Sequence, residues 1–223
     1  MCAPLHPEGR PNTASSWPKE IPNMLPPDKI AQGAYDLAKS ILPESIFNHS
    51  IRVALLAKWL AERERSEWAS PGKLSLLAVA CLLHDVGCAH QFDGAQRFEV
   101  EGADAAASYL RQHEIPKSDI HEVWQAIALH TSPGIAERIS SCARLVRQAV
   151  LLDFGKSLDQ ESQAFRQHIE ESFPRIGIEK VLGDVVVDQA LRQPQKAPPA
   201  SWPGILLRAK QDNPEWTGVN KAF

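Results

Sequence analysis

A histidine and an aspartate stand side by side in this chain at the point where an apolar segment ends. His84 and Asp85 follow the run LSLLAVACLL, which has the composition of a buried helix. Burying an imidazole beside a carboxylate costs several kcal/mol unless another group compensates the charge. A divalent metal ion would compensate it, and two further apolar runs hold residues of the same kinds, His49 in FNHSIRVALLAKWL and Asp153 in VLLDFG. His49, His84, Asp85 and Asp153 therefore predict a metal site with mixed nitrogen and oxygen ligands.

The alternative interpretation needs no metal. It consists of two buried histidines and two acids at helix ends, each satisfied by ordinary hydrogen bonds. It has to explain why three apolar segments carry polar side chains where a core would favour leucine. We favour the metal site for this reason and expect one divalent ion, zinc first, with iron or manganese as alternatives.

The order of these residues resembles that of a known superfamily. A histidine, a His-Asp dipeptide and a later aspartate on successive helices are typical of the HD superfamily of metal-dependent hydrolases and lyases, and here they lie within residues 45–155. The resemblance implies an all-α fold, a helical bundle of the HD type with the metal site between core helices. It also implies that the four residues named above bind the metal.

Two further segments resemble one branch of that superfamily, the cyanamide hydratases, which add water to a nitrile carbon to give urea. The segments are RFEVEGADAAASYL, from Arg97 to Leu110, and AIALHT, from Ala126 to Thr131. Many dinuclear HD enzymes carry a histidine four residues before the glycine of a His-x-x-x-Gly-Ala helix start, and this chain has Phe98 there. Phe98 therefore implies one metal ion instead of two, which disfavours a dinuclear cyclic-dinucleotide phosphodiesterase or a di-iron oxygenase.

Acid–base chemistry needs a side chain close to the water that the metal activates. We expect Asp85, Glu99 and His130 in catalytic roles, because His130 ends an apolar run and the hydratase branch favours Glu99 over Glu101. Both glutamates also stand at a helix start, where the helix dipole stabilises a carboxylate without any catalytic role. For His130 the alternatives are a metal ligand and a core histidine bonded to a backbone carbonyl.

Two arginines are candidates for substrate binding. Arg97 can anchor a substrate or pair with the acids that follow it. Arg52 lies three residues after His49 on the same helix, so we expect it to reach the rim of the pocket. A phosphohydrolase would need such cations around the phosphate, with Arg144 as a third, and this keeps that function as the alternative to a hydratase. A non-catalytic HD scaffold is disfavoured because all four predicted ligands are present.

Composition excludes several classes of protein. The chain has 223 residues, 43% of them hydrophobic and 23% charged, which is ordinary for one globular domain. A formal net charge of −3 and a pI near 6.2 give no general attraction to nucleic acid or to an anionic membrane. The four cysteines form no CxxC pair, and without a secretory signal or a membrane-length apolar run we expect a cytoplasmic enzyme. Its expected partner is a small-molecule substrate, and formation of a homo-oligomer is left open.

Helical periodicity covers most of the chain, and no alternating strand pattern is convincing. We expect residues 1–27 to be an extended or disordered segment, 28–213 a single HD-type helical domain and 214–223 a tail. His49 shares a helix face with Val53 and so points inward. The expected helices cover residues 28–41, a helix from about 44 that carries His49, and then 73–84, 98–113, 119–130, 139–153, 160–172, 179–192 and 204–211. A polar access loop covers 88–96.

Overall fold

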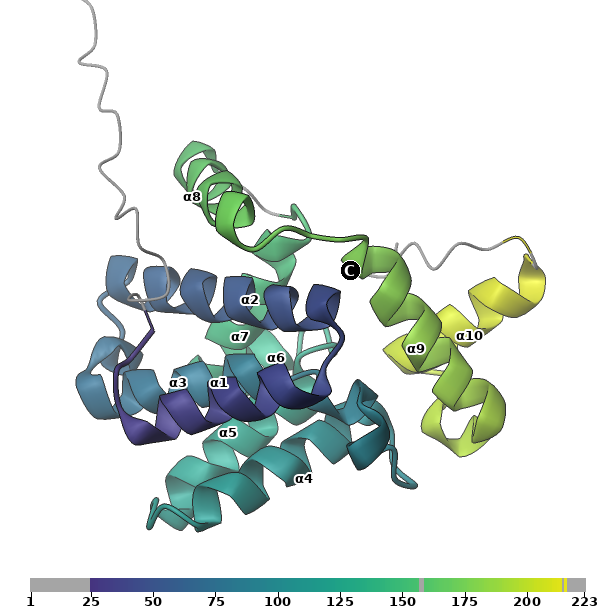
Figure 1. The fold of residues 1–223 in the computed structure, drawn as a ribbon, viewed down its shortest axis with the longest axis horizontal. Helices are drawn as coiled ribbons and strands as arrows, with labels where there is room; N and C mark the ends of the chain where they lie inside the picture. Colours follow the sequence, from purple (N-terminus) through teal and green to yellow (C-terminus); the bar gives the residue numbers. More distant parts are fainter. Residues whose placement is uncertain (1–24, 157–158, 214, 216–223) are drawn as a thin grey trace, which may run out of the picture.

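The computed structural model describes residues 25–156, 159–213 and 215, and in that part of the chain every regular element is helical (Figure 1). The α-helices are α1 Lys29–Ile41, α2 Glu44–Arg63, α3 Pro71–Leu83, α4 Phe98–Arg111, α5 Lys117–Leu129, α6 Ala136–Ile139, α7 Ser141–Asp153, α8 Gln160–Ser172, α9 Ile178–Arg192 and α10 Trp202–Asp212. Short 3-10 helices join some of them: η2 Glu67–Ala69, η3 Val86–Cys88, η4 His90–Phe92 and η5 Pro194–Lys196. The predicted all-α fold class is confirmed, while nearly all of the predicted extended segment and tail lies outside the described residues.

Helix α2 lies at the centre of the bundle and is buried on nearly all sides. It packs against α3 and α7, and also against α8 and α9. Sixteen of its 20 residues are buried, including the polar His49 and Arg52. Because apolar residues occupy almost every face of the helix, a polar side chain on it is carried into the interior.

Helix α3 is the most apolar element of the bundle. It is buried without interruption from Ser75 to Leu83. The sequence predicts no apolar run of membrane length, but among the described residues the segment Pro71–Cys88 is long and apolar enough to cross a membrane by length and composition. However, 78% of it is buried inside the protein. That degree of burial is typical of a core helix.

Three helices end at polar residues that meet near α2. His84 caps the end of α3, His130 caps the end of α5, and Asp153 is the last residue of α7. These three helices pack against one another, and α3 and α7 pack against α2. The packing of the apolar faces therefore carries all three polar ends toward His49.

The predicted helix over residues 139–153 is two elements in the structure. Ser140 is extended, with φ −158° and ψ 163°, and separates α6 from α7. Its side chain accepts a hydrogen bond from the Ala143 N–H, which is how a serine caps a helix N-terminus. The other predicted helices agree with the structure to within a few residues; α3, for example, begins two residues early at Pro71, since proline is favoured in a first turn.

Two glycines let the segment after the His-Asp dipeptide lie directly against the start of α4. A Cβ on Gly87 would stand 1.9 Å from the carbonyl oxygen of Phe98, and a Cβ on Gly102 would stand 3.1 Å from the carbonyl oxygen of His84. The backbones can approach this closely only because glycine has no side chain. The contact brings the first residues of α4 next to the end of α3.

Helices α9 and α10 pack on each other at one side of the bundle, on the right in Figure 1. Helix α9 also contacts α2 and η3. Trp202, the first residue of α10, is buried, and its ring centroid lies 5.8 Å from that of Phe98. The C-terminal helices thus reach across to the start of α4.

Candidate metal centre

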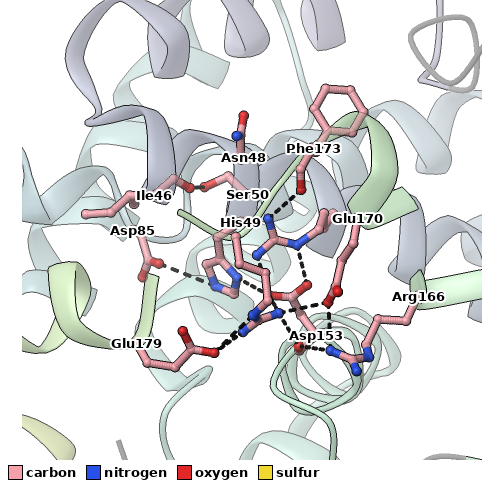
Figure 2. A network of polar contacts seen from close by, with 12 residues as sticks. Ile46, Asn48, His49, Ser50, Asp85, Asp153, Arg166, Glu170, Phe173 and Glu179 are labelled. Atoms are coloured by element: carbon pink, nitrogen blue, oxygen red, sulfur yellow. Dashed lines mark hydrogen bonds and ion pairs between the residues drawn. The ribbon is translucent and has the colours of Figure 1, made fainter. Parts of the chain in front are cut away.

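Three side chains with metal-ligand chemistry meet between α2 and the end of α3. His49 comes from α2, and His84 and Asp85 follow the last residue of α3; their ligand atoms lie within 4.8 Å of one another, and all three residues are buried. His49 Nε2 lies 3.2 Å from His84 Nε2 and 3.6 Å from Asp85 Oδ2, and His84 Nε2 lies 3.1 Å from the same oxygen. Figure 2 shows His49 and Asp85 facing each other. The structure therefore brings together three of the four predicted ligands.

The hydrogen-bond partners of the two imidazole rings indicate that a cation fits this cluster. His49 Nδ1 lies 2.7 Å from Asp153 Oδ2, and His84 Nδ1 lies 2.6 Å from the carbonyl oxygen of Cys81. A carboxylate or carbonyl oxygen can only accept, so the hydrogen of each neutral ring is at Nδ1 and each Nε2 keeps a lone pair. These lone pairs face each other and the Asp85 carboxylate. A divalent metal ion between them would convert a repulsive arrangement into a set of ligands.

Asp85 gives a second indication that a cation fits this cluster. Among the described residues neither of its buried carboxylate oxygens has a hydrogen-bond partner, because the imidazole nitrogens at 3.1–3.6 Å are too distant or poorly directed. Burial raises the pKa of the Asp85 carboxyl, but the imidazoles of His84, His130 and His49 outweigh it and hold that pKa well below its usual value. A buried ionised carboxylate without hydrogen bonds is costly, so the residues present fit a bound metal ion.

Asp153, the fourth predicted ligand, lies behind His49 and outside the cluster. Its Oδ2 accepts the hydrogen bond from His49 Nδ1 at 2.7 Å, as Figure 2 shows. Arg52 donates to both of its oxygens, from Nε to Oδ1 at 2.7 Å and from Nη2 to Oδ2 at 2.9 Å. Burial raises the pKa of Asp153, but His49 and Arg52 hold it far below its usual value. A carboxylate on the far nitrogen of a histidine ligand fixes the orientation and tautomer of that ligand.

The sequence placed Arg52 at the rim of the pocket, whereas the structure buries it completely. Its Nε and Nη2 donate to Asp153, and its Nη1 donates to the carbonyl oxygens of Phe173 at 2.9 Å and Pro174 at 3.4 Å. The i, i+3 spacing does put Arg52 on the same side of α2 as His49. Because every nitrogen of the guanidinium is engaged, its contacts give no support to substrate binding.

His130 reaches the other oxygen of Asp85 from the end of α5. Its Nδ1 lies 2.7 Å from the carbonyl oxygen of Ile127, and its Nε2 lies 3.5 Å from Asp85 Oδ1. Its ring centroid is 4.9 Å from that of His84 and 5.7 Å from that of Phe98. The sequence left open whether His130 is a metal ligand or a core histidine bonded to a backbone carbonyl; the structure shows the carbonyl bond and also places the ring against Asp85.

Glu99 is fully buried at the start of α4. Arg97 donates to it from Nε at 3.0 Å and from Nη2 at 2.5 Å, and the Thr131 hydroxyl donates to it at 2.6 Å. Thr131 directly follows the histidine that caps α5, so Glu99 lies beside the centre without belonging to the ligand cluster. Glu101 instead accepts a hydrogen bond from the Gln96 N–H at 2.7 Å and thereby braces the access loop. The two glutamates therefore have different contacts in the structure, and Glu99 is the one that lies next to the predicted centre.

The centre is closed to solvent, since each of the side chains that form it is 2% exposed or less. The C-terminal helices contribute to this closure. Gln189 donates to the carbonyl oxygen of Gly87 at 2.9 Å, and both Lys196, which is buried despite its charge, and Arg192 donate to Asp93, at 2.5 Å and 2.7 Å. These contacts tie α9 and η5 to the access loop. Sequence reasoning missed them, because a glutamine and an arginine near the end of a predicted helix, and a lysine in the Pro-rich segment after it, carry no signal that distinguishes them from solvated residues.

Comparison with known proteins agrees with this geometry. Residues 46–153 match the HD domain family. The matched segment begins three residues before His49 and ends at Asp153, so it contains the cluster, Glu99 and His130 but none of the helices α8 to α10. No curated protein matches the chain.

Proposed function

We propose that this protein uses a divalent metal ion to activate water against a small neutral molecule, because residues 46–153 match the HD domain family, whose members are generally metal-dependent hydrolases. The reaction that we propose is hydration of a nitrile group, with cyanamide, which gives urea, as the first substrate to test. His49, His84 and Asp85 would hold the metal together with one further side chain. A metal bound there would lower the pKa of its water toward neutrality and polarise the electrophile.

The observation that carries this choice is that the arginines next to the centre are already paired. Arg52 is bound to Asp153 and Arg97 to Glu99, and both carboxylates are fully buried. A phosphate ester is negatively charged, and enzymes bind it with converging arginines and lysines. If either arginine turned to a phosphate, a buried carboxylate would lose its main ion-pair partner, which costs up to about 3–5 kcal/mol. A neutral substrate imposes no such cost.

Glu99 is the residue that we propose for acid–base chemistry. Hydration of a nitrile moves a proton from the attacking water to the nitrogen, and a carboxylate that accepts the first proton can deliver it. The hydrogen bonds from Arg97 and from Thr131, the residue after His130, hold the Glu99 carboxylate in one orientation. Arg97, whose side chain is 24% exposed, connects this buried acid to the surface and is our candidate for the residue that a substrate meets on entry.

A phosphohydrolase is the alternative, and one observation favours it. The side chains of Arg97 and Arg175 are 24% and 22% exposed, and each contacts a buried acid of the site, Glu99 and Asp153 respectively. Two guanidinium groups are therefore accessible from outside and could receive a phosphate if these acids released them. Arg144, the third arginine that the sequence offered, instead pairs with Glu64, with Nη2 2.5 Å from Oε2.

One sample decides between the two reactions. Protein purified without added metal is analysed for metal content by mass spectrometry and then assayed with cyanamide, by following urea, and with a generic phosphate ester, by following phosphate. About one metal ion per chain, with urea formed and the ester intact, supports the hydratase. Phosphate release alone, or two metal ions per chain, contradicts it and favours the phosphohydrolase.

A further inference from the structure

We propose that the access loop, residues 88–96, is a lid over the metal centre, and that Lys196 is the latch that holds this lid closed. A metal ion and a substrate would both reach the centre when the loop opens. The proposal rests on the metal-binding part of the proposed function and does not depend on the substrate.

The metal centre is closed in this conformation. Four of its side chains are 1% exposed or less: His49, His84, Asp85 and Glu99. A metal ion or a substrate can reach them only when part of the protein moves. The access loop begins three residues after Asp85 and ends directly before Arg97, the residue that pairs with Glu99. Opening of this loop would therefore uncover the ligand cluster and the start of α4 together.

The access loop is built less firmly than the helices around the centre. Beyond Cys88 its regular structure is one short 3-10 helix, η4 His90–Phe92, and every residue from 90 to 96 is exposed or partly exposed. Ala89 separates η4 from η3 with an extended backbone, φ −75° and ψ 144°. Short elements with much exposed backbone are the parts of a fold that open at the lowest cost. Ala89 is thus a natural hinge between the packed η3 and the rest of the loop.

The contacts that close the loop are made at Asp93 and Gly94. Lys196 Nζ donates to Asp93 Oδ1 at 2.5 Å and to the carbonyl oxygen of Gly94 at 3.0 Å, and Arg192 Nη2 donates to Asp93 Oδ2 at 2.7 Å. The side chain of Lys196 is 2% exposed, whereas that of Arg192 is 59% exposed. An exposed ion pair contributes little, but a buried ammonium depends on its partners. Lys196 is therefore the main latch.

Few other contacts hold the loop. Among the described residues, its remaining polar contact with another element is the hydrogen bond from the Gln96 N–H to Glu101, at 2.7 Å. The side chain of Phe92 is partly buried against the core. None of these contacts belongs to the packing of α2, α3 and α7 on one another. The loop can therefore open while the core of the bundle stays folded.

Cys88 can report this opening. Its thiol is buried at the base of the loop, and burial raises its pKa well above the usual value. The charges that also act on it are those of Asp85 and Glu99 in the site and of Lys196 and Asp93 at the latch. A thiol reagent attacks an accessible thiolate, so Cys88 reacts only after the loop has opened.

Thiol labelling of the metal-free, full-length protein tests the proposal, with each cysteine followed separately by mass spectrometry. In the wild type Cys88 should react faster than Cys142, which is fully buried in α7 and becomes accessible only when the core unfolds. Lys196→Met should raise the labelling rate of Cys88 by about 10-fold or more, as expected for the loss of hydrogen bonds from a charged group, and leave that of Cys142 unchanged.

Lys180→Met is the matched control. It makes the same substitution on α9, where Lys180 is 62% exposed and pairs with Asp184, and it should change neither labelling rate. Asp93→Asn weakens the latch from its other side and should also speed the labelling of Cys88, so it decides the question if Lys196→Met does not fold.

Two outcomes would overturn the proposal. Equal labelling rates of Cys88 and Cys142, changed together by Lys196→Met, would mean that only global unfolding reaches the centre. A Cys88 rate that stays the same in both Lys196→Met and Asp93→Asn would mean that these contacts do not hold the loop closed.

Release of zinc to an excess of chelator gives an independent measurement. Zinc-loaded Lys196→Met should lose its metal about 10-fold faster than the wild type at unchanged equilibrium affinity, because a latch controls passage and not the bound state. An unchanged release rate would mean that the metal leaves by another route, which contradicts the lid. A protein that binds no zinc would reject the proposed function, while thiol labelling would still decide whether Lys196 holds the loop closed.

Discussion

Arg52 and Asp153 are joined in the protein interior by two parallel hydrogen bonds, of 2.7 and 2.9 Å, across 101 positions of sequence. Neither side chain is exposed. The pair connects the middle of α2 to the end of α7, and the same carboxylate holds the Nδ1 of His49 at 2.7 Å. This ion pair therefore links two core helices and also contacts the side chain of a proposed metal ligand.

Replacing Arg52 by methionine should strongly destabilise the fold, because it leaves the buried charge of Asp153 without its partner. We expect the free energy of unfolding of the metal-free protein, measured by urea denaturation, to fall by about 3–5 kcal/mol. Arg52→Lys should lose much of the same amount, since an ammonium cannot form the two parallel bonds. The control is Arg144→Met, which breaks the partly exposed pair with Glu64 and should cost about 1 kcal/mol or less. An equal decrease in the free energy of unfolding in the two methionine variants would mean that the buried pair stabilises the fold no more than the partly exposed pair does.

The same pair predicts how stability depends on pH. Burial raises the pKa of Asp153, but His49 and Arg52 hold it well below the ordinary value of 3.8. As the pH falls, the unfolded chain takes up a proton at this carboxyl before the folded chain does. The contribution of Asp153 is thus fully present above about pH 5 and is lost progressively below about pH 4.

Urea unfolding of the metal-free protein between about pH 7 and pH 3 tests this dependence. The loss of stability toward low pH should be less steep in Asp153→Asn than in the wild type. An equally steep loss in the variant would assign the effect to other carboxyl groups.

Removing either residue of the His-Asp dipeptide should remove the metal. In His84→Ala and in Asp85→Ala we expect the metal content to fall from about one equivalent per chain to near zero, because each change deletes a ligand from the cluster. Elemental analysis of the purified variants gives the content. His90→Ala, at an exposed position in η4, is the control and should keep a full equivalent. A full equivalent in either of the first two variants would place the metal elsewhere in the protein.

Glu99→Gln should keep the metal and lower kcat by about 100-fold or more, since the amide cannot exchange the proton that hydration moves. Metal content and steady-state kinetics on the same preparation separate the two effects. Glu101→Gln is the control, because it changes the same residue type two positions away. The Glu101 side chain accepts a hydrogen bond from the access loop, and the kcat of this variant should stay close to that of the wild type. An unchanged kcat in Glu99→Gln would transfer the acid–base role to Glu101 or His130.

Gly87→Ala should destabilise the protein by about 1–3 kcal/mol, the usual cost of forcing extra volume into a packed interior. The added Cβ would stand 1.9 Å from the carbonyl oxygen of Phe98, so η3 and α4 have to separate. Gly72→Ala is the matched control: nothing lies within 4 Å of its added Cβ, and alanine is the better residue in α3. Thermal unfolding should show a lower Tm for the first variant and an equal or higher Tm for the second. Equal Tm values would mean that the close approach adds nothing to stability.

Local sequence patterns predicted the helices and the residues that face the core, because both depend on residues near one another in the sequence. The apolar period of α2 placed His49 on the face of Val53, and both are buried. The same period put Arg52 on that side of the helix but could not say what it would bind, because its partner Asp153 belongs to another helix. Periodicity defines a face, and only the tertiary fold defines the partner that the face meets.

Two other differences have the same kind of cause. Ser140 was read as part of a helix, since serine occurs both inside helices and at their N-caps, and here its backbone is extended. Lys196 lies between Pro194 and Pro198 in a segment that looked solvated, yet it is buried against Asp93, which lies 103 positions earlier. A charge without a visible partner in the sequence is normally placed at the surface, and this pairing forms only once α9 packs against the bundle.

Helix α9 and η5 contact the access loop, and α10 contacts the start of α4, so segments beyond residue 153 cover the predicted site. The residues that could bind metal and move protons all lie within 46–153, whereas Gln189, Lys196 and Trp202, which close the approach to them, all lie beyond it. If the proposed function holds, the reacting groups and the groups that cover them are thus encoded in different stretches of the chain. Substitutions in α9 and α10 would then change which compounds reach the site while every predicted metal-binding residue stays the same, so a new substrate preference can evolve without any change in the reacting groups.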